Sequence, residues 1–312
     1  MLLILMERKL IKQGGGGYTI YLPKKWVKKK SLKEGDLVKI KELETSLVID
    51  SELKESNEIT IDINPKNEGY LSIILSHAYR KGYDKIIING LNHDLIKEIS
   101  KVIKNILLGF EITDRTENYC KIENISEPTE QKYNAILRKI FFLMKELNSL
   151  IACDFGVYKN SEEISDVKIN LDRFILFCKR ILIKEKYEKD LVLEWELLTF
   201  LTHIGHSYFY AYDYSEKNKI KTNKTLLSLF EKLKNYFYLF EKAYFEEDIE
   251  KIHEINRLRN EYHFGEVLSL LKKSKGDENV LLSYIKDIFR FIQIGTSPIL
   301  SKILEKNQSM SA

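Results

Sequence analysis

The stretch from Tyr133 to Leu147 reads YNAILRKIFFLMKEL and decides the fold of the larger part of this chain. Its apolar residues recur three or four positions apart, which is the spacing of one face of an α-helix. These residues are Tyr133, Ile136, Leu137, Ile140, Phe141, Met144 and Leu147. From Glu127 onward β-strand patterns almost vanish, and about six helical stretches follow. We therefore predict an all-α region over residues 127–312.

A short internal repeat divides this helical region. The run Leu201–Ser207, LTHIGHS, aligns with the run Phe291–Ser297, FIQIGTS, at an offset of 90 residues. Self-similarity at a fixed offset is typical of tandem structural units. We predict two three-helix bundles, approximately over 127–214 and 222–306. The helical stretches are separated by polar breaks at 154–162, 184–189, 214–225, 243–247 and 273–279.

Two smaller units precede the helices. Within residues 53–126 the apolar residues of Ile59–Ile63 alternate with polar ones, as in a half-buried strand, and Ile86–Ile88 is a short apolar run typical of an inner strand. Helical spacing follows each strand, over Leu71–Ala78 and over Leu95–Ile106. We predict a layered α/β connector module.

Residues 1–52 form the first unit. Gly14–Gly17 supply a tight connection before a strand over Tyr18–Leu22. Pro23 ends that strand and suits the first turn of a helix over 24–30. The rest of the unit comprises a turn at 34–36 and strands at 37–40 and 47–49.

Charge is distributed unevenly between these units. Residues 1–50 hold 11 Lys and Arg against 6 Asp and Glu, a net charge of +5, and the remainder holds 39 against 40. A basic head on a neutral body indicates an anionic partner for the head, nucleic acid first and anionic lipid second. The alternative is a solvated lysine-rich helix in a lysine-rich protein.

The head resembles the AbrB/SpoVT family of swapped-hairpin domains. The resemblance rests on Lys12-Gln13-Gly14, on the run from Thr19 to Trp26 that contains Leu22-Pro23-Lys24, and on the run Leu32–Ile40 that contains Gly35-Asp36. In that family two chains interleave their hairpins in one small β-barrel, which implies an obligate homodimer. The resemblance implies that DNA faces Arg8, Lys9, Lys12, Lys24, Lys25, Lys28 and Lys29.

The remainder resembles archaeal-type PhoU proteins, whose body is a tandem pair of three-helix bundles. The connector match rests on Leu71–Ile88 and Gly109–Ile112, and the bundle match on the two Ile-Gly pairs of the repeat and on Leu171-Asp172-Arg173 followed by Arg180. The resemblance implies control of phosphate uptake or phosphate homeostasis. The whole fold is then α+β, with a swapped-hairpin barrel, an α/β connector and an all-α PhoU-like domain.

The metal cluster of PhoU proteins is not expected here. The carboxylates of the family hallmark correspond to Thr202 and His206 in the first bundle and to Ile292 and Thr296 in the second. Asp172, His203 and His206 remain weak candidates for a small transition-metal site. We expect His253 and His263 on a solvated helix face. We expect the aromatic runs Tyr208–Tyr210 and Tyr236–Tyr238 in the core and interfaces of the bundles.

No enzyme motif is present, because the sequence lacks a Gly-x-Ser-x-Gly, a Walker loop and a His-Glu-x-x-His. The odd count of 3 cysteines without a Cys-x-x-Cys favours a reducing cytoplasm. No stretch reaches the roughly 18 apolar residues that a membrane span needs. Met6 is a second candidate, beside Met1, for the start residue.

Two functional hypotheses follow. In the first, the chain is a homodimeric, non-enzymatic DNA-binding regulator without a cofactor. In the second, the head only dimerises, and the helical body is a signalling adaptor that contacts a phosphate transporter ATPase or a sensor kinase. A metal-storing or metal-sensing protein that uses His203 and His206 is a third.

Overall fold

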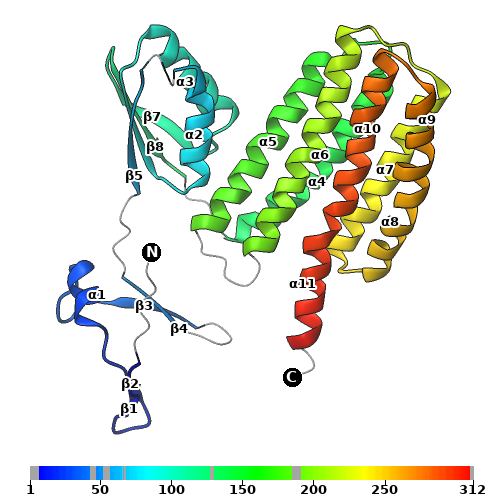
Figure 1. The fold of residues 1–312 in the computed structure, drawn as a ribbon. Coiled ribbons are helices and arrows are strands. Elements are labelled where there is room, and N and C mark those ends of the chain that lie inside the picture. Colours follow the sequence, from blue (N-terminus) through cyan, green and yellow to red (C-terminus); the bar gives the residue numbers. More distant parts are fainter. Residues whose placement is uncertain are drawn as a thin grey trace. The chain divides into compact units, whose positions relative to one another are not determined.

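The computed structural model describes residues 7–42, 47–51, 57–64, 66, 68–126, 130–184 and 191–309. The chain divides into two compact units, Met1–Ser56 and Asn57–Ala312. Its fold is mixed α+β and mostly helical, as predicted (Figure 1). The predicted boundaries at 52/53 and 126/127 stay predictions, and the two start candidates, Met1 and Met6, lie outside the described residues.

The first unit, which we call the head, contains two separate hairpins. Strand β1 (Ile11–Lys12) pairs antiparallel with β2 (Tyr18–Thr19), and β3 (Val38–Glu42) pairs antiparallel with β4 (Leu47–Ser51). Helix α1 (Lys24–Lys29) lies between the hairpins in sequence. The predicted helix and the two later strands are confirmed, whereas the strand predicted over Tyr18–Leu22 is shorter. The described strands of the head form no closed barrel within one chain.

The second unit begins with a four-stranded sheet of strand order β5-β6-β8-β7. Strands β5 (Glu58–Asp62) and β6 (Lys85–Asn89) run parallel and are joined by α2 (Leu71–Arg80), after a 3-10 turn at Glu68–Tyr70. This is the βαβ arrangement that the sequence predicted. Helix α3 (His93–Asn105) leads to a hairpin of β7 (Phe110–Arg115) and β8 (Tyr119–Asn124), and neither strand was predicted.

One face of this sheet is covered by helices. Ile86 and Ile88 of β6 are buried and pair with Ile122 and Cys120 of β8, which are buried as well. Alternate residues of a strand point to opposite faces, so these four side chains form one apolar layer. In Figure 1, α2 and α3 lie over this sheet. In the sequence of β8, the apolar residues Cys120 and Ile122 alternate with the polar residues Lys121 and Glu123, which is a strand pattern.

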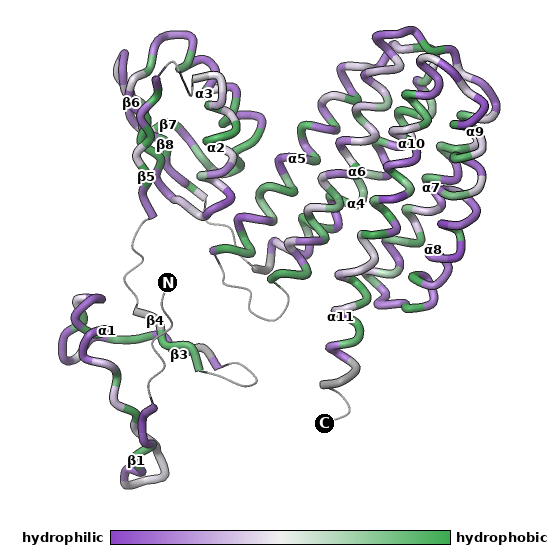
Figure 2. The backbone as a smooth tube through the Cα atoms, in the orientation of Figure 1, coloured by the Kyte–Doolittle hydropathy of each residue, from purple (hydrophilic) through white to green (hydrophobic). Residues whose placement is uncertain are grey.

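All described residues from 130 onward lie in helices and their connections. The helices are α4 (Glu130–Asp154), α5 (Ser161–Lys184), α6 (Leu191–Lys217), α7 (Lys224–Phe245), α8 (Ile249–Glu261), a π-helical turn (Tyr262–Val267), α9 (Leu268–Lys273), α10 (Asp277–Ile294) and α11 (Thr296–Ser309). Helix α4 packs on α5 and α7, and α6 packs on α5 and α10. In Figure 2 hydrophobic and hydrophilic segments alternate along the long helices, as expected for amphipathic helices.

The stretch that decides the helical fold lies in α4. Of its predicted face, Leu137, Ile140, Phe141, Met144 and Leu147 are fully buried, so the predicted core is confirmed. The ring of Phe141 packs against rings of α7 at centroid distances of 5.6 to 5.9 Å. Helix α4 is therefore held to α7 by aromatic contacts.

The two repeated Ile-Gly pairs stand where helices approach closely. A Cβ on Gly205, within α6, would lie 2.5 Å from Leu171 Cδ2 of α5. A Cβ on Gly295, at the end of α10, would lie 3.2 Å from the ring of Phe240 of α7. Both glycines therefore let a neighbouring side chain pack against helix backbone. The repeats differ in one respect, because α6 continues past Gly205 whereas α10 ends at Ile294.

His253 and His263 differ in burial. His253 is exposed, as expected, with 63% of its side chain accessible. His263 lies in the π-helical turn with 7% exposure, and its Nδ1 lies 3.2 Å from the backbone oxygen of Lys286. The expectation of a solvated face was therefore wrong for His263. Burial lowers the pKa of His263 from its usual value.

The turn after β6 requires glycine. Gly90 has φ +76°, and a Cβ there would overlap the backbone oxygen of Ile63, which follows β5. Gly276 also has a positive φ, +61°, but a Cβ there would meet nothing within 4 Å. Alanine substitutions at Gly90 and Gly276 therefore distinguish the energetic cost of steric overlap from that of backbone strain.

We predict that Gly90→Ala lowers the free energy of unfolding by about 2–5 kcal/mol, because left-handed strain and overlap with backbone add. Gly276→Ala carries only the backbone strain of a conformation with φ +61° and ψ −137°, and should cost about 1–3 kcal/mol. Urea denaturation of both variants measures the difference. Equal losses would show that the overlap at Gly90 has no energetic weight.

Candidate functional site

The helix α1 presents the basic residues of the head. Pro23 precedes it, and the acidic residues that often stabilise a first turn are absent from it. The side chains of Lys24, Lys25, Lys28 and Lys29 are exposed, whereas Trp26 is partly buried. The remaining predicted DNA contacts, Arg8, Lys9 and Lys12, are exposed on the first hairpin and the residues before it. One chain therefore presents the seven predicted residues on two separate elements.

The described residues of the head form no hydrophobic core. None of their side chains is buried, and many of the large apolar ones are exposed. Ile40 of β3 is 63% exposed, and Leu47 of β4 is 66% exposed. The hydrophobic residues along β3 and β4 can be followed in Figure 2. Among the described residues of the head, the large apolar residues that are exposed are Leu10, Ile11, Tyr18, Ile20, Tyr21, Leu37, Ile40 and Leu47.

The metal candidates are brought together only in part. His206 Nε2 of α6 lies 3.3 Å from Asp172 Oδ1 of α5, and Lys168 donates a hydrogen bond to Asp172. His203 instead stacks on the ring of Phe291 at a centroid distance of 5.2 Å. Among the described residues no group of three His, Cys, Asp or Glu side chains could hold a metal ion.

Burial and charged neighbours act in opposite directions on the pKa of Asp172. Burial alone would raise the pKa of this carboxyl group, but His206, whose Nε2 lies 3.3 Å from Oδ1, and the charge of Lys168 lower it below its usual value. The pKa of His203 is lowered, first by burial and then by the charges of His206 and Lys179. Lys168 therefore supplies a compensating positive charge to Asp172.

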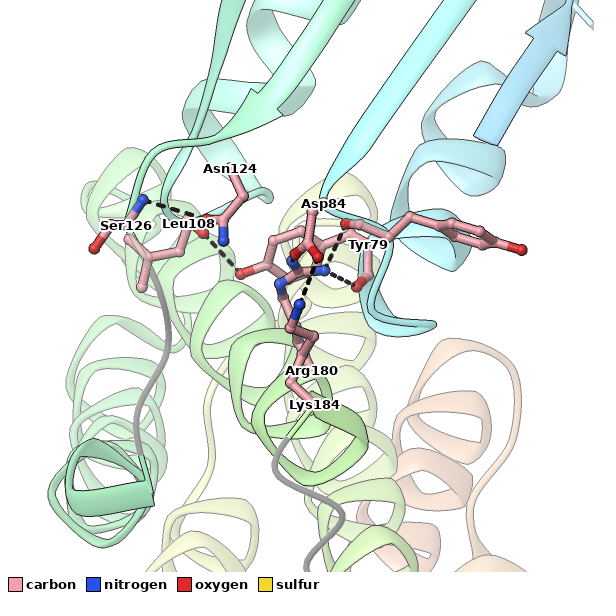
Figure 3. Close-up of polar contacts among 8 residues, drawn as sticks. Tyr79, Asp84, Leu108, Asn124, Ser126, Arg180 and Lys184 are labelled. Atoms are coloured by element: carbon pink, nitrogen blue, oxygen red, sulfur yellow. Dashed lines mark hydrogen bonds and ion pairs between the residues drawn. The ribbon is translucent and has the colours of Figure 1, made fainter. Parts of the chain in front are cut away.

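A buried arginine joins the α/β module to the helices. Arg180 of α5 has no exposed surface, and its Nη1 donates to the backbone oxygens of Tyr79 and Tyr83, each at 2.8 Å (Figure 3). Its Nη2 donates to Asp84 Oδ1 at 2.6 Å, while Lys184 Nζ donates to Asp84 Oδ2 at 2.6 Å. One carboxylate thus receives two cations from successive turns of α5.

Aromatic rings enclose this arginine. The guanidinium carbon lies 5.0 Å from the ring centroid of Tyr79 and 4.8 Å from that of Phe110. Tyr79 in turn donates from its hydroxyl to the backbone oxygen of Leu108 at 2.9 Å. Burial raises the pKa of Tyr79 above its usual range. The side chain therefore remains a neutral donor in this contact.

No family model, curated protein or solved structure matches the chain. The assignment to PhoU proteins with an AbrB/SpoVT head therefore stays a prediction from the motifs quoted above. Among the described residues, no helix is both long enough and apolar enough to cross a membrane.

The joint at Arg180 is the feature that the sequence did not reveal. In the sequence, Arg180 was assigned only to a fragment of the bundle motif, and its pairing with Asp84 was not predicted. One signal existed, because Arg180 lies on α5 among Cys178, Ile181 and Leu182, all of which are buried. A charged residue inside an apolar stretch usually has a dedicated partner.

We predict that Arg180→Met lowers the free energy of unfolding of the second unit by about 3–5 kcal/mol, because it leaves the partly buried carboxylate of Asp84 and two backbone oxygens with fewer donors. The control is Lys217→Met, which removes an exposed ion pair with Asp213 and should cost at most about 1 kcal/mol. Urea denaturation compares the two. A similar small loss for both variants would contradict the role assigned to Arg180.

Proposed function

We propose that this chain is a homodimeric, non-enzymatic DNA-binding regulator of the PhoU type, whose head belongs to the AbrB/SpoVT class. The observation that carries the proposal is the head itself. It is strongly basic, yet no described side chain in it is buried. Such a unit needs a partner that covers its apolar residues and a second, anionic partner for its lysines.

A second copy of the head is the best candidate for the first partner. Each exposed apolar side chain would contribute about 1.5–3 kcal/mol when fully buried. Two chains that interleave their hairpins would bury these residues against each other and would place the lysines of both copies on one particle. The swapped-hairpin barrel inferred from the motifs is one arrangement of this kind.

DNA is the best candidate for the second partner. The exposed lysines of α1 offer ammonium groups to phosphates, which gives affinity that depends on salt and little on sequence. Base-reading residues are not assigned. A role in phosphate uptake or homeostasis rests on the resemblance to PhoU proteins alone.

The body is proposed to be two tandem three-helix bundles. Support comes from the two Ile-Gly pairs, each of which admits a close side-chain contact, and from the packing of α6 on α10, the helices that carry them. The alternative function is an adaptor that contacts a transporter ATPase or a sensor kinase through this body. In that case the exposed apolar residues of the head would serve dimerisation alone.

We predict that Ile40→Glu converts the dimer to monomer, because a charge would replace an apolar side chain of the pairing surface. Val192→Glu is the matched control, since Val192 is 73% exposed at the start of α6 in the other unit. Size-exclusion chromatography with light scattering gives the masses. A monomeric wild-type chain, or a dimer that survives Ile40→Glu, would argue against pairing through the head.

We predict that replacing Lys24, Lys25, Lys28 and Lys29 with Gln weakens DNA binding roughly tenfold or more and lowers the salt slope by about one unit for each phosphate that is no longer neutralised. The effect should be similar on the DNA upstream of its own gene and on a scrambled duplex, because phosphate contacts do not depend on sequence. Fluorescence anisotropy at several salt concentrations measures both.

The matched control for this experiment carries the same change in charge elsewhere. The exposed residues Lys234, Lys272, Lys273 and Lys275 lie in the second unit, and their replacement with Gln should leave affinity nearly unchanged. Absence of binding by the wild-type chain would favour the adaptor. Equal loss in both variants would indicate an effect of net charge and not a site on α1.

A further inference from the structure

A cavity of about 820 Å³ lies where the α/β module meets α5. Helix α3 lines it with Ser100, Ile103 and Lys104, and α5 lines it with Ile169, Asn170 and Arg173. On each helix these residues are three and four positions apart, so one face of each helix looks into the same space. The volume is within the range of about 300–1,000 Å³ that is typical of small-molecule sites.

Arg173 is the group in this lining that points to a ligand. It makes no hydrogen bond or ion pair with any residue in the part of the chain that the structure describes, and its Nε is shielded from solvent without a partner. A shielded donor that makes no hydrogen bond is costly. Arg180, seven residues further along α5, differs because its Nη1 and Nη2 atoms donate to Tyr79, Tyr83 and Asp84.

A guanidinium group favours one class of ligand. Its planar fork of N–H donors matches carboxylate and phosphoryl oxygens in two parallel hydrogen bonds. Lys104 adds a second cation from the facing helix, while Glu111 and Asp166 add two carboxylates to the lining. Two cations against two carboxylates disfavour a polyanion. They suit a molecule with one oxyanion at one end and hydroxyl or amino donors elsewhere.

We propose that this cavity binds a small organic molecule that carries one terminal carboxylate or phosphoryl group, with Arg173 as the residue that holds the oxyanion. Ser100, Asn105 and Asn170 offer neutral hydrogen-bonding groups to the rest of the molecule. A ligand in this place contacts both α3 and α5. It therefore bridges the same two parts of the fold that Arg180 and Asp84 join. This proposal does not rest on DNA binding by the head.

The test is isothermal titration calorimetry of the full chain with four probes. Glycerol 3-phosphate and inorganic phosphate represent the phosphoryl class, and lactate and leucine represent the carboxylate class. We expect at least one probe to bind, and the class that binds identifies the oxyanion. Arg173→Gln should weaken that binding at least about tenfold, because a charge-assisted hydrogen bond is removed. Arg257→Gln, at an exposed arginine of α8, should leave the affinity within about twofold.

Two further variants test the proposal even if Arg173→Gln does not fold. Arg173→Lys keeps the charge but loses the fork and should give an intermediate affinity. Asn170→Phe fills the cavity from α5 without removing the arginine and should abolish binding. If Arg173→Gln does not fold, Asn170→Phe decides the matter. The proposal is overturned if none of the four probes binds the wild-type chain, or if binding is unchanged in both Arg173→Gln and Asn170→Phe.

Discussion

The buried guanidinium of Arg180 is the interaction on which the arrangement of the second unit depends. It donates to two backbone oxygens at the end of α2 and to the carboxylate of Asp84, just before β6. Transfer of a charge out of water is costly unless hydrogen bonds and an opposite charge compensate it. The compensation exists only when α5 lies against the α/β module in one register. The interaction therefore selects a particular docking more than it adds stability.

A second buried polar group plays a related part among the helices. Glu194 of α6 is 2% exposed and accepts hydrogen bonds from the hydroxyls of Tyr133 and Tyr244 and from Lys302. These partners come from α4, α7 and α11. Four helices thus meet at one carboxylate, and any shift of one helix would leave a buried oxygen without a donor. Hydrophobic packing alone does not specify helix positions so narrowly.

The head differs from the second unit, because none of its described side chains is buried. Its described residues build two short hairpins and a helix of six residues, but they enclose nothing. An isolated two-stranded hairpin is marginally stable at best in water. The second unit has a continuous hydrophobic core, whereas many large apolar side chains among the described residues of the head are exposed. This difference is the physical basis for proposing a second copy as part of the functional unit.

The features best predicted from the sequence were those that neighbouring residues decide. The periodicity of YNAILRKIFFLMKEL predicted α4 and its buried face, and the alternation in Ile59–Ile63 predicted β5, because neighbouring side chains alone decide such patterns. Strands β7 and β8 were missed, although Cys120 and Ile122 of β8 alternate with polar residues as they do in a half-buried strand. The buried state of His263 was missed because several charged residues precede it in the sequence, while its burial comes from packing near α10, where it contacts the backbone oxygen of Lys286.

The sequence by itself determined the helical character of residues 130–309, the βαβ order of the middle module and the basic character of the head, all of which depend on residue type and local spacing. Only the tertiary structure decided that Arg180 reaches Asp84, 96 residues earlier in the chain, and that Arg173 lines a cavity without a protein partner among the described residues. Both arginines lie on the same helix and have the same chemistry. Their difference arises from what the α/β module places opposite each, and no local pattern in α5 contains that information.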